Sequence, residues 1–513
     1  MSDYVKMACG VFAAINHAKQ PIFPILYWGI RAQNHRGHQS HGFLTYNGEF
    51  HVHKALDLVP KIRRGNVERW LNMLPGYLGL ANVRYTTSGG KDYRALQRGT
   101  QPVLAEKDGV KLAVSFNGNV VNTFELLNEI RRVWPSFSYQ CDAELICRKL
   151  LIELTERRDL DSAVKACMEE IEGAFSVACL TGKGEFFAFK DVHGIRPLCA
   201  GHSRDNEIHA FSSETVGLDI NEFIFDFEIE PGELVTVSEQ GFCRERLVSN
   251  CKRAFCAFEF AYFARPDSKI NGKYVYEVRE AFGRNLAKEN PDIVKDADVI
   301  ISMPETGNDA AYGLHEATGI RWERASRRHR YVTERAFILL PNERYKTISK
   351  KINILGSKVR GKNVIIVDDS IVRGDTTRVV VEKLRKMGAK KVYVLITFPR
   401  ITGPCFYGID MATYGELIGS KHTPEEIAEI IGADAVRYQS INGFVNATGL
   451  KKEELCLGCV SGKYPTPLAQ KLAEEMKEKF EKGYEETGRI YETGKFVQSI
   501  ANSVTTRFHG TTG

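Results

Sequence analysis

The sequence lacks several features that would assign it to a membrane, a secretory route or a nucleic acid. No stretch of its 513 residues is apolar for the length of a membrane span. The first eight residues include Asp3 and contain no apolar signal core. There is no basic tract with interleaved aromatic residues, no repeat of fixed period, and a formal net charge of only +6. We therefore expect a cytoplasmic protein that binds neither nucleic acid nor membrane.

Composition indicates an ordinary globular chain. It is 43% hydrophobic and 26% charged, and 513 residues leave room for two to four domains. The chain has 12 cysteines. In a reducing compartment, clustered cysteines are candidate metal ligands or nucleophiles before they are candidate disulfides.

The clearest local pattern is a strand, a turn and a helix in the second half of the chain. Residues 364–367 form a β-branched run typical of a strand buried in a parallel sheet, and Asp368 and Asp369 follow it directly. A helical spacing begins after Gly374, and residues 392–398 form the next predicted strand. Carboxylates and a helix N-terminus therefore meet at the carboxyl end of a strand, where open α/β sheets bind ligands. A sugar phosphate suits this site, because the carboxylates can bind its hydroxyl groups and the helix N-terminus can bind its phosphate.

The run Val-Asp-Asp-Ser-Ile-Val-Arg-Gly, which ends at Gly374, resembles the phosphoribosyl pyrophosphate (PRPP) signature of type I phosphoribosyltransferases. Within that group, these residues in this order resemble the signature of the glutamine phosphoribosylpyrophosphate amidotransferase family. The resemblance implies that Asp368 and Asp369 bind the ribose hydroxyls and are candidate ligands of Mg²⁺, which the pyrophosphate would hold for the most part. The residues implied in phosphate binding are Ser370, Arg373, Gly374, Thr376 and Thr377.

Asp375 departs from that signature, because the family usually has an uncharged Thr or Asn there. As a helix N-cap, its side chain would occupy the N–H groups that a phosphate needs. At about 4 Å from one phosphate charge it would cost roughly 4 kcal/mol at an effective dielectric near 20. We expect weakened PRPP binding unless a cation compensates or the side chain turns away.

Cys9 opens the predicted N-terminal domain. It follows Ala8 and precedes an apolar run, and cleavage after Ala8 would expose an α-amine with a pKa near 8 that can take the thiol proton. Residues 1–8 are therefore interpreted as a propeptide. Further motifs follow in the order of class II glutaminase domains, the N-terminal nucleophile (Ntn) hydrolases: Asn34-His-Arg-Gly37, Val83-Arg-Tyr-Thr-Thr-Ser-Gly89, Phe116-Asn-Gly-Asn119, Cys141-Asp-Ala-Glu144 and Asp191-Val-His-Gly-Ile-Arg-Pro-Leu198.

The resemblance implies a role for each motif. Cys9 is the nucleophile, Arg84 and Thr87 hold the glutamine carboxylate, and Asp142 with Gly118 holds its ammonium. Asn117 and the Gly118 N–H stabilise the tetrahedral oxyanion. Each residue taken alone has a structural explanation: Arg84 as an ion-pair partner, Asn117-Gly118 as a hairpin turn, and Asp142 as a helix cap. Together they favour a glutaminase, although Asn82 stands where the family commonly has His.

Four cysteines in the second half form a candidate metal site. They are Cys256, Cys405, and the C-x-x-C pair Cys456 and Cys459. Four thiolates suit either zinc or a [4Fe–4S] cluster, and the residues alone leave both open. The resemblance favours the iron–sulfur cluster, because the cluster-containing branch of the family has cysteines in these contexts.

The remaining substrate loops lie between these cysteines. By resemblance, Pro304-Glu305-Thr306 meets the pyrophosphate, and residues 327–332 belong to a flexible loop that covers the substrate. The family's usual glycine after this loop is replaced by Thr333-Glu334. From Thr466 onward, apolar residues repeat every four positions, which predicts an amphipathic helix on its own domain.

The predicted fold class is α+β and α/β, an Ntn-hydrolase αββα glutaminase domain followed by a type I phosphoribosyltransferase domain. The predicted divisions are a propeptide (1–8), the glutaminase domain (9–240), the phosphoribosyltransferase domain (241–465) and a C-terminal helix and tail (466–513). The implied substrates are glutamine and PRPP, the implied product is 5-phosphoribosylamine, and the family forms homo-oligomers. An alternative is a diverged paralogue with glutaminase activity and a weakened PRPP site, serving another acceptor or a regulatory role.

Overall fold

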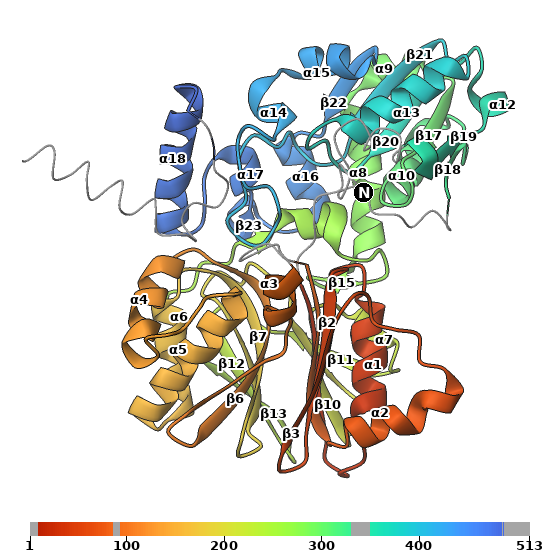
Figure 1. Cartoon of the computed structure of the whole chain (residues 1–513). Coiled ribbons are helices and arrows are strands. Elements are labelled where there is room, and N and C mark those ends of the chain that lie inside the picture. The colour runs from red at the N-terminus through yellow and green to blue at the C-terminus, as the bar shows by residue number, and fades with distance from the viewer. Residues whose placement is uncertain (1–8, 86–92, 330–348, 485, 487–513) are drawn as a thin grey trace, which may run out of the picture.

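The protein consists of two parts that meet along a broad contact (Figure 1). The structure is a computed structural model, and it describes residues 9–85, 93–329, 349–484 and 486. The predicted propeptide, Thr87 and the Thr333-Glu334 pair lie outside the described residues.

Two antiparallel sheets build the first part. One has seven strands in the order β11-β9-β10-β1-β4-β2-β3, and the other has six in the order β13-β12-β8-β7-β6-β5. In chain order the strands are β1 (Gly10–Asn16), β2 (Ser40–Tyr46), β3 (Phe50–Leu56), β4 (Leu78–Arg84), β5 (Val103–Lys107), β6 (Val110–Val120), β7 (Gly173–Thr181), β8 (Phe186–Lys190), β9 (Cys199–His202), β10 (Ile208–Ser212), β11 (Ile224–Glu228), β12 (Glu233–Ser238) and β13 (Gly241–Arg246).

Helices cover the outer face of each sheet, which gives four αββα layers (Figure 1). The alternation along β1 shows how the layers are filled, because successive side chains of a strand point to opposite faces. Val11 and Ala13 lie in the core between the sheets, while Phe12 and Ala14 pack towards α1. The helices are α1 (Phe23–Ala32), α2 (Val67–Met73) and α7 (Val216–Asp219) on one side, α4 (Thr123–Val133), α5 (Asp142–Arg157) and α6 (Leu160–Glu170) on the other, and α3 (Tyr93–Arg98) near the second part.

A parallel sheet in the order β17-β20-β21-β22 is the centre of the second part. Its strands are β17 (Val299–Ser302), β20 (Asn363–Asp368), β21 (Lys391–Ile396) and β22 (Ala435–Tyr438). β20 is buried on both faces, as its β-branched run predicts. Val364 and Ile366 face one helical layer, and Ile365 and Val367 face the other. The helices around this sheet are α8 (Val275–Glu289), α9 (Pro291–Asp296), α10 (Asn308–Thr318), α12 (Gly356–Val359), α13 (Asp375–Lys386), α15 (Pro424–Ile431) and α16 (Ile441–Thr448).

Further short elements complete the structure. The paired strands are β14 (Phe255–Cys256) with β23 (Leu455–Cys456), β15 (Lys269–Ile270) with β16 (Lys273–Tyr274), and β18 (Ser326–Arg328) with β19 (Ile352–Ile354). A π-helix covers Glu259–Phe263. The remaining helices are α14 (Ile418–Lys421), α17 (Gly458–Ser461) and α18 (Pro467–Glu481).

The ends of the predicted domains can be compared with these elements. β13 pairs with β12 from Gly241 to Arg246, so the first sheet system extends beyond the predicted boundary at residue 240. The predicted C-terminal helix is confirmed as α18, whose Leu472 and Met476 lie in the core of the second part. That core also includes Val121 and Ala174 of the first part, so apolar packing is continuous across the junction.

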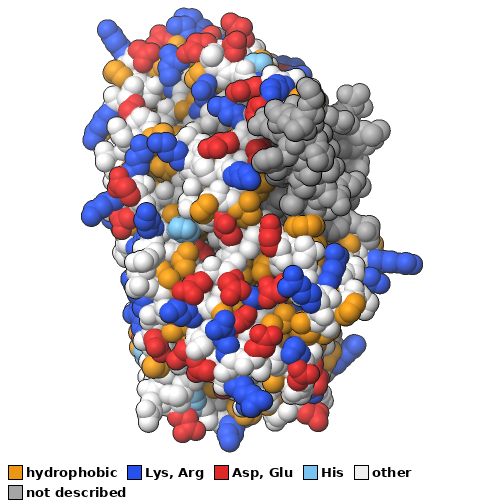
Figure 2. All heavy atoms as spheres, turned by 90° about the vertical axis from the view of Figure 1, so that its left-hand side faces the viewer, with side chains coloured by type: hydrophobic (Ala, Val, Ile, Leu, Met, Phe, Trp, Pro, Cys, Tyr) orange, Lys and Arg blue, Asp and Glu red, His pale blue; other side chains and the backbone are white. Residues whose placement is uncertain are grey.

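The surface carries charges of both signs. On the face shown in Figure 2, Lys and Arg side chains are interspersed with Asp and Glu, in keeping with the formal net charge of +6. None of the described helices is long and apolar enough to serve as a transmembrane span.

Candidate active sites

Cys9 lies directly before β1, at the end of the first part that faces the second. Gly10 pairs with Val83 of the antiparallel strand β4, so the same register places Cys9 beside Arg84. The side chain of Cys9 is buried. Burial raises the pKa of the Cys9 thiol, while the charge of Arg84 and a hydrogen bond from the Tyr85 backbone act in the opposite direction. The sulfur is therefore a largely neutral thiol that needs a base to become a nucleophile.

Asn117 and Gly118 lie within β6 and pair with Ser176 and Phe175 of β7, so the hairpin-turn alternative is wrong. Asn117 is fully buried, and neither its Oδ1 nor its Nδ2 has a hydrogen-bond partner among the described residues. A Cβ atom on Gly118 would lie 1.8 Å from the carbonyl oxygen of Ala174, so only glycine fits there. A buried amide without a partner is costly, which suits a group that a ligand completes.

Asp142 is the first residue of α5, and Cys141 occupies the N-cap position. The Asp142 Oδ2 accepts a hydrogen bond of 2.9 Å from the backbone N–H of Val120, two residues beyond Gly118. The hydroxyl of Tyr139 donates to the other carboxylate oxygen. Asp142 therefore connects the start of α5 to the end of β6. A role as helix cap does not explain this hydrogen bond, because Val120 lies outside α5.

Two residues that the sequence did not single out complete this end of the molecule. The Nε2 of Gln101 lies 3.8 Å from the Cys9 sulfur, and the Gln101 Oε1 accepts a hydrogen bond of 2.7 Å from the Phe116 N–H. A Cβ atom on Gly99 would lie 2.5 Å from a guanidinium nitrogen of Arg84. The segment from Gly99 to Gln101 therefore wraps around Cys9 and Arg84. The pairing of β5 with β6 brings this segment there, so spacing along the sequence gave no signal.

At the other candidate site, Asp368 ends β20, and both it and Asp369 are buried. The Asp369 carboxylate accepts a hydrogen bond of 2.6 Å from the Ser370 hydroxyl and another from Thr306. Burial raises the pKa of Asp369, and these two hydroxyls counter the shift. Thr306 belongs to the Pro304-Glu305-Thr306 turn after β17. The structure therefore brings this turn and the acidic pair together at one edge of the parallel sheet.

Helix α13 begins differently from the sequence-based expectation. Gly374 is the N-cap, with φ of +89°, and Asp375 is the first helical residue. The side chain of Asp375 is exposed and makes no capping hydrogen bond, so the prediction that it caps the helix is wrong. Thr376 and Thr377 are buried in the first turn, and Arg373 forms an ion pair with Glu416. The backbone N–H groups of this turn are not occupied by an Asp375 side chain.

The four predicted cysteine ligands also converge. Parallel pairing of β14 with β23 sets Cys256 opposite Cys456. Burial raises the pKa of the Cys459 thiol, and the nearby thiols of Cys405, Cys456 and Cys256 add to the rise. Among the described residues, only Glu129, Glu153 and Glu170 place three possible ligand atoms within 4.8 Å of one another, so no three of the four sulfurs lie that close together. Lys149 already pairs with all three of those glutamates.

Comparisons with known proteins decide the family. A glutamine amidotransferase domain model matches residues 92–219. The amidophosphoribosyltransferase of Methanocaldococcus jannaschii is 37% identical over 474 residues, which are 89% of this chain and 98% of the relative. The amidophosphoribosyltransferase of Bacillus subtilis is 35% identical, with coverage of 90% and 95%. The chain belongs to the amidophosphoribosyltransferase family.

A solved structure extends the likeness from sequence to fold. The glutamine PRPP amidotransferase of B. subtilis, complexed with ADP and GMP, is similar with a TM-score of 0.79 and 33% identity. The match covers 90% of this chain and 98% of that one. The expected fold, a glutaminase domain of the Ntn type followed by a phosphoribosyltransferase domain, is confirmed. The amidophosphoribosyltransferase match runs across both parts and does not favour the diverged-paralogue alternative.

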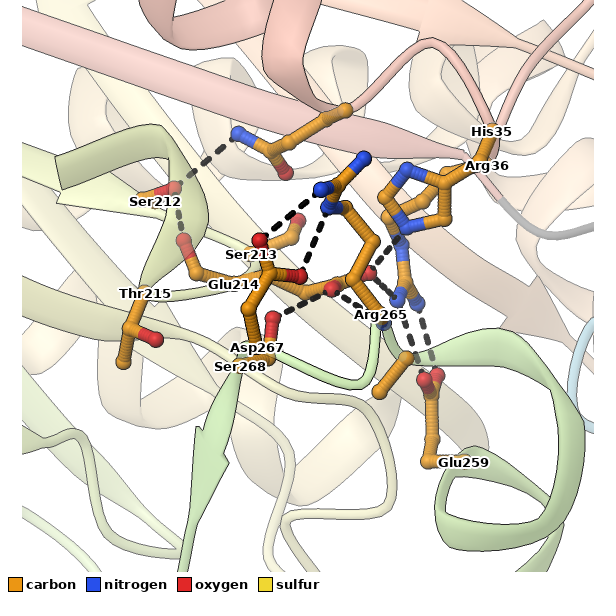
Figure 3. Close-up of polar contacts among 12 residues, drawn as sticks. His35, Arg36, Ser212, Ser213, Glu214, Thr215, Glu259, Arg265, Asp267 and Ser268 are labelled. Carbon is orange, nitrogen blue, oxygen red and sulfur yellow. Dashed lines mark hydrogen bonds and ion pairs between the residues drawn. The ribbon is translucent and has the colours of Figure 1, made fainter. Parts of the chain in front are cut away.

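In this member of the amidophosphoribosyltransferase family, buried charged side chains link the two parts (Figure 3). Arg36 donates from Nε to the Cys9 carbonyl oxygen at 3.1 Å and from Nη2 to Glu259 at 2.6 Å. Its Nη1 lies 2.5 Å from Glu214. Arg196 bonds to the same Glu259 at 3.1 Å. Because Glu259 lies in the π-helix of the second part, these contacts fix the nucleophile's backbone against the neighbouring domain.

Proposed function

We propose that this chain hydrolyses glutamine at Cys9 and transfers the released ammonia to PRPP, giving 5-phosphoribosylamine for purine biosynthesis. The observations that carry the proposal are the strand register that sets Arg84 beside Cys9, and the contacts of Gln101 that join the Cys9 sulfur to Phe116, directly before the buried amide of Asn117. The family's shared architecture and the acidic pair of the second part supply the acceptor half.

In the glutaminase half, the side chains match the charges of glutamine. Arg84 would hold the carboxylate, with Thr87 from outside the described residues as a second contact. Asp142 and the Gly118 backbone would hold the ammonium. Attack by the Cys9 sulfur on the amide carbon puts negative charge on the oxygen, and the Asn117 Nδ2 and Gly118 N–H would stabilise it, at roughly 3 to 4 kcal/mol for each donor. Ammonia leaves, and water then hydrolyses the thioester.

Activation of Cys9 depends on a base. Because burial raises the pKa of the thiol, the sulfur does not ionise readily by itself. Removal of residues 1–8 would create an α-amine on Cys9 itself, with a pKa near 8, within reach of its own side chain. We therefore propose that the propeptide is cleaved before the enzyme becomes active.

In the phosphoribosyl half, Asp368 and Asp369 would accept hydrogen bonds from the ribose hydroxyls. Ser370, Arg373, Gly374, Thr376 and Thr377 would surround the 5-phosphate, which the N-terminus of α13 attracts. The buried carboxylate pair also suits Mg²⁺, which when bound would neutralise charge on the pyrophosphate leaving group. Ammonia then attacks C1 of the ribose as pyrophosphate departs.

The four cysteines fit a metal cofactor, and we propose a [4Fe–4S] cluster held by Cys256, Cys405, Cys456 and Cys459. A single zinc ion bound by four thiolates at about 2.3 Å would bring the sulfurs to roughly 3.8 Å from one another. The resemblance to the cluster-containing branch of the family favours the [4Fe–4S] cluster over zinc. The cluster would tie β14 and β23 together and stabilise the second part. Iron and sulfide analysis with visible absorbance tests this, and stoichiometric zinc without iron would contradict it.

Ammonia must pass between the sites without exposure to water, because at neutral pH free ammonia is mostly ammonium and has no lone pair. The core that continues across the junction supports such protection.

We also propose that the protein forms a homo-oligomer, as the resemblance implies. We also propose a reducing compartment such as the cytoplasm, where thiol ligands of a cluster are not consumed by disulfide formation.

The proposed reaction can be divided experimentally into its halves. Pyrophosphate release from PRPP is measured with glutamine or with ammonium as the nitrogen source. We expect Cys9→Ala to abolish the glutamine-dependent rate and keep the ammonium-dependent rate, whereas Asp368→Asn should lower both. Glutamine hydrolysis that persists in Cys9→Ala would remove the assignment of the nucleophile.

A further inference from the structure

Gln101 touches the Cys9 sulfur from a position fixed by two neighbouring strands. It is buried, and its Nε2 lies 3.8 Å from the sulfur, within hydrogen-bond reach for that atom. Its backbone lies against β2, where a Cβ atom on Gly42 would be 2.1 Å from the Gln101 carbonyl oxygen. Because Gly42 has no side chain, the Gln101 backbone can approach this closely.

The orientation of the Gln101 carboxamide follows from its second contact. The Phe116 backbone N–H can only donate, and it meets the Gln101 side chain at 2.7 Å. The atom at that contact must therefore be the carbonyl oxygen, which leaves the NH₂ group facing the Cys9 sulfur. Val103, the first residue of β5, pairs with Val114 of the antiparallel strand β6. The same register places Gln101, two residues earlier, opposite Phe116, where its side chain takes the place of a backbone hydrogen-bond partner.

We propose that Gln101 is a positioning residue for the nucleophile, because its NH₂ group, anchored by the contact with Phe116, donates to the Cys9 sulfur and fixes the orientation of that side chain. A donor aimed at sulfur favours the thiolate over the thiol and restricts the rotation of the side chain. Phe116 directly precedes Asn117, so one carboxamide connects the attacking atom to the strand that carries the oxyanion donor. The effect on turnover depends on the proposed glutaminase function, whereas the effect on the thiol does not.

Asn82 offers a matched control. It is also a buried carboxamide, and its Nδ2 donates to the carbonyl oxygen of the same Phe116 at 3.3 Å and to the Ser115 hydroxyl at 3.1 Å. Removal of either carboxamide leaves a backbone group of Phe116 without its partner. Of the two, only Gln101 has a hydrogen bond to the Cys9 sulfur. Loss of strand support can therefore be separated from loss of the sulfur contact.

The experiment measures how fast iodoacetamide alkylates Cys9 at each pH, by mass spectrometry of the Cys9 peptide in the intact full chain. Gln101→Glu is the informative variant, because a carboxylate oxygen still accepts from Phe116 while the donor to sulfur is lost. Gln101→Met removes both contacts at nearly constant volume. Asn82→Leu is the control, and thermal melting of each variant reports its fold.

We expect the pH midpoint of Cys9 alkylation to rise by about one unit in Gln101→Met and by more in Gln101→Glu, where a negative charge faces the sulfur. The midpoint in Asn82→Leu should remain that of the unaltered protein. If the Gln101 variants move the midpoint no further than Asn82→Leu, the proposal is overturned. A shifted midpoint in a protein that does not hydrolyse glutamine even after residues 1–8 are removed would refute the glutaminase and leave the role of Gln101 standing.

Discussion

Replacement of Asp375 by Asn should tighten PRPP binding. Asp375 is the first residue of α13, at the helix end where the 5-phosphate is proposed to bind. Two negative groups at one helix N-terminus repel each other, and Asn removes the charge at nearly constant shape. The side chain of Asp375 is exposed and caps nothing, so the substitution leaves the backbone of the loop unchanged.

The magnitude follows from that exposure. Two unit charges about 4 Å apart interact by roughly 4 kcal/mol at an effective dielectric near 20, and by about 1 kcal/mol in water. Because Asp375 is exposed, the value for water applies. A phosphate with about 1.5 to 2 charges then gives a gain of roughly 1.5 to 2 kcal/mol, or about 10- to 30-fold in Kd.

Titration calorimetry with PRPP and Mg²⁺ measures this difference directly. Glu382→Gln is the matched control, because it removes one negative charge from the same helix about 10 Å away, roughly one Debye length in 0.1 M salt. The gain in Asp375→Asn should shrink as salt is added, while Glu382→Gln should change little throughout. Equal effects of the two substitutions, or weaker binding in Asp375→Asn, would refute the reasoning.

Three further predictions concern other parts of the molecule. Arg84→Lys should raise the KM for glutamine by at least about 10-fold and leave the ammonium-dependent rate intact, because lysine cannot bind a carboxylate in a bidentate manner. Glu259→Gln should lower the free energy of unfolding by about 3 kcal/mol in denaturant titrations, since Arg36 and Arg196 lose the buried carboxylate between them; no loss would contradict the importance of that network. Burial alone would raise the pKa of Glu214, but His35 and Arg36 outweigh it and hold the pKa well below the ordinary value of 4.5. The contribution of Glu214 to the free energy of unfolding is therefore fully present above pH 4.5 and is lost as the pH falls below that value. In Glu214→Gln, the free energy of unfolding should decrease less steeply as the pH is lowered.

Local periodicity was enough to predict the central elements of both parts. The strand after Cys9, the strand that ends at Asp368 and the helix after Thr466 are all present as β1, β20 and α18. Each of these depends on the order of apolar and polar residues within one short segment. The acidic pair could be placed at a strand's carboxyl end for the same reason.

Features set by pairing between distant segments could not be read in this way. Asn117 and Gly118 belong to a strand because β7 pairs with β6 along its length, although an Asn-Gly sequence often forms a turn. Gln101 reaches Cys9 from 92 residues away, and Arg36 meets Glu259 across 223 residues. Asp375 was predicted to be the helix cap, but Gly374 takes that position in a left-handed conformation.

The transfer of nitrogen between the two sites is tested most directly with glutamine labelled with ¹⁵N in its amide. The enzyme is given this glutamine, PRPP and Mg²⁺ in a large excess of unlabelled ammonium. The phosphoribosylamine is trapped chemically, and its ¹⁵N content is measured by mass spectrometry. If ammonia released at Cys9 travels within the protein to the ribose at Asp368 and Asp369, the product carries mostly ¹⁵N. A product with the isotope ratio of the surrounding ammonium would contradict the account.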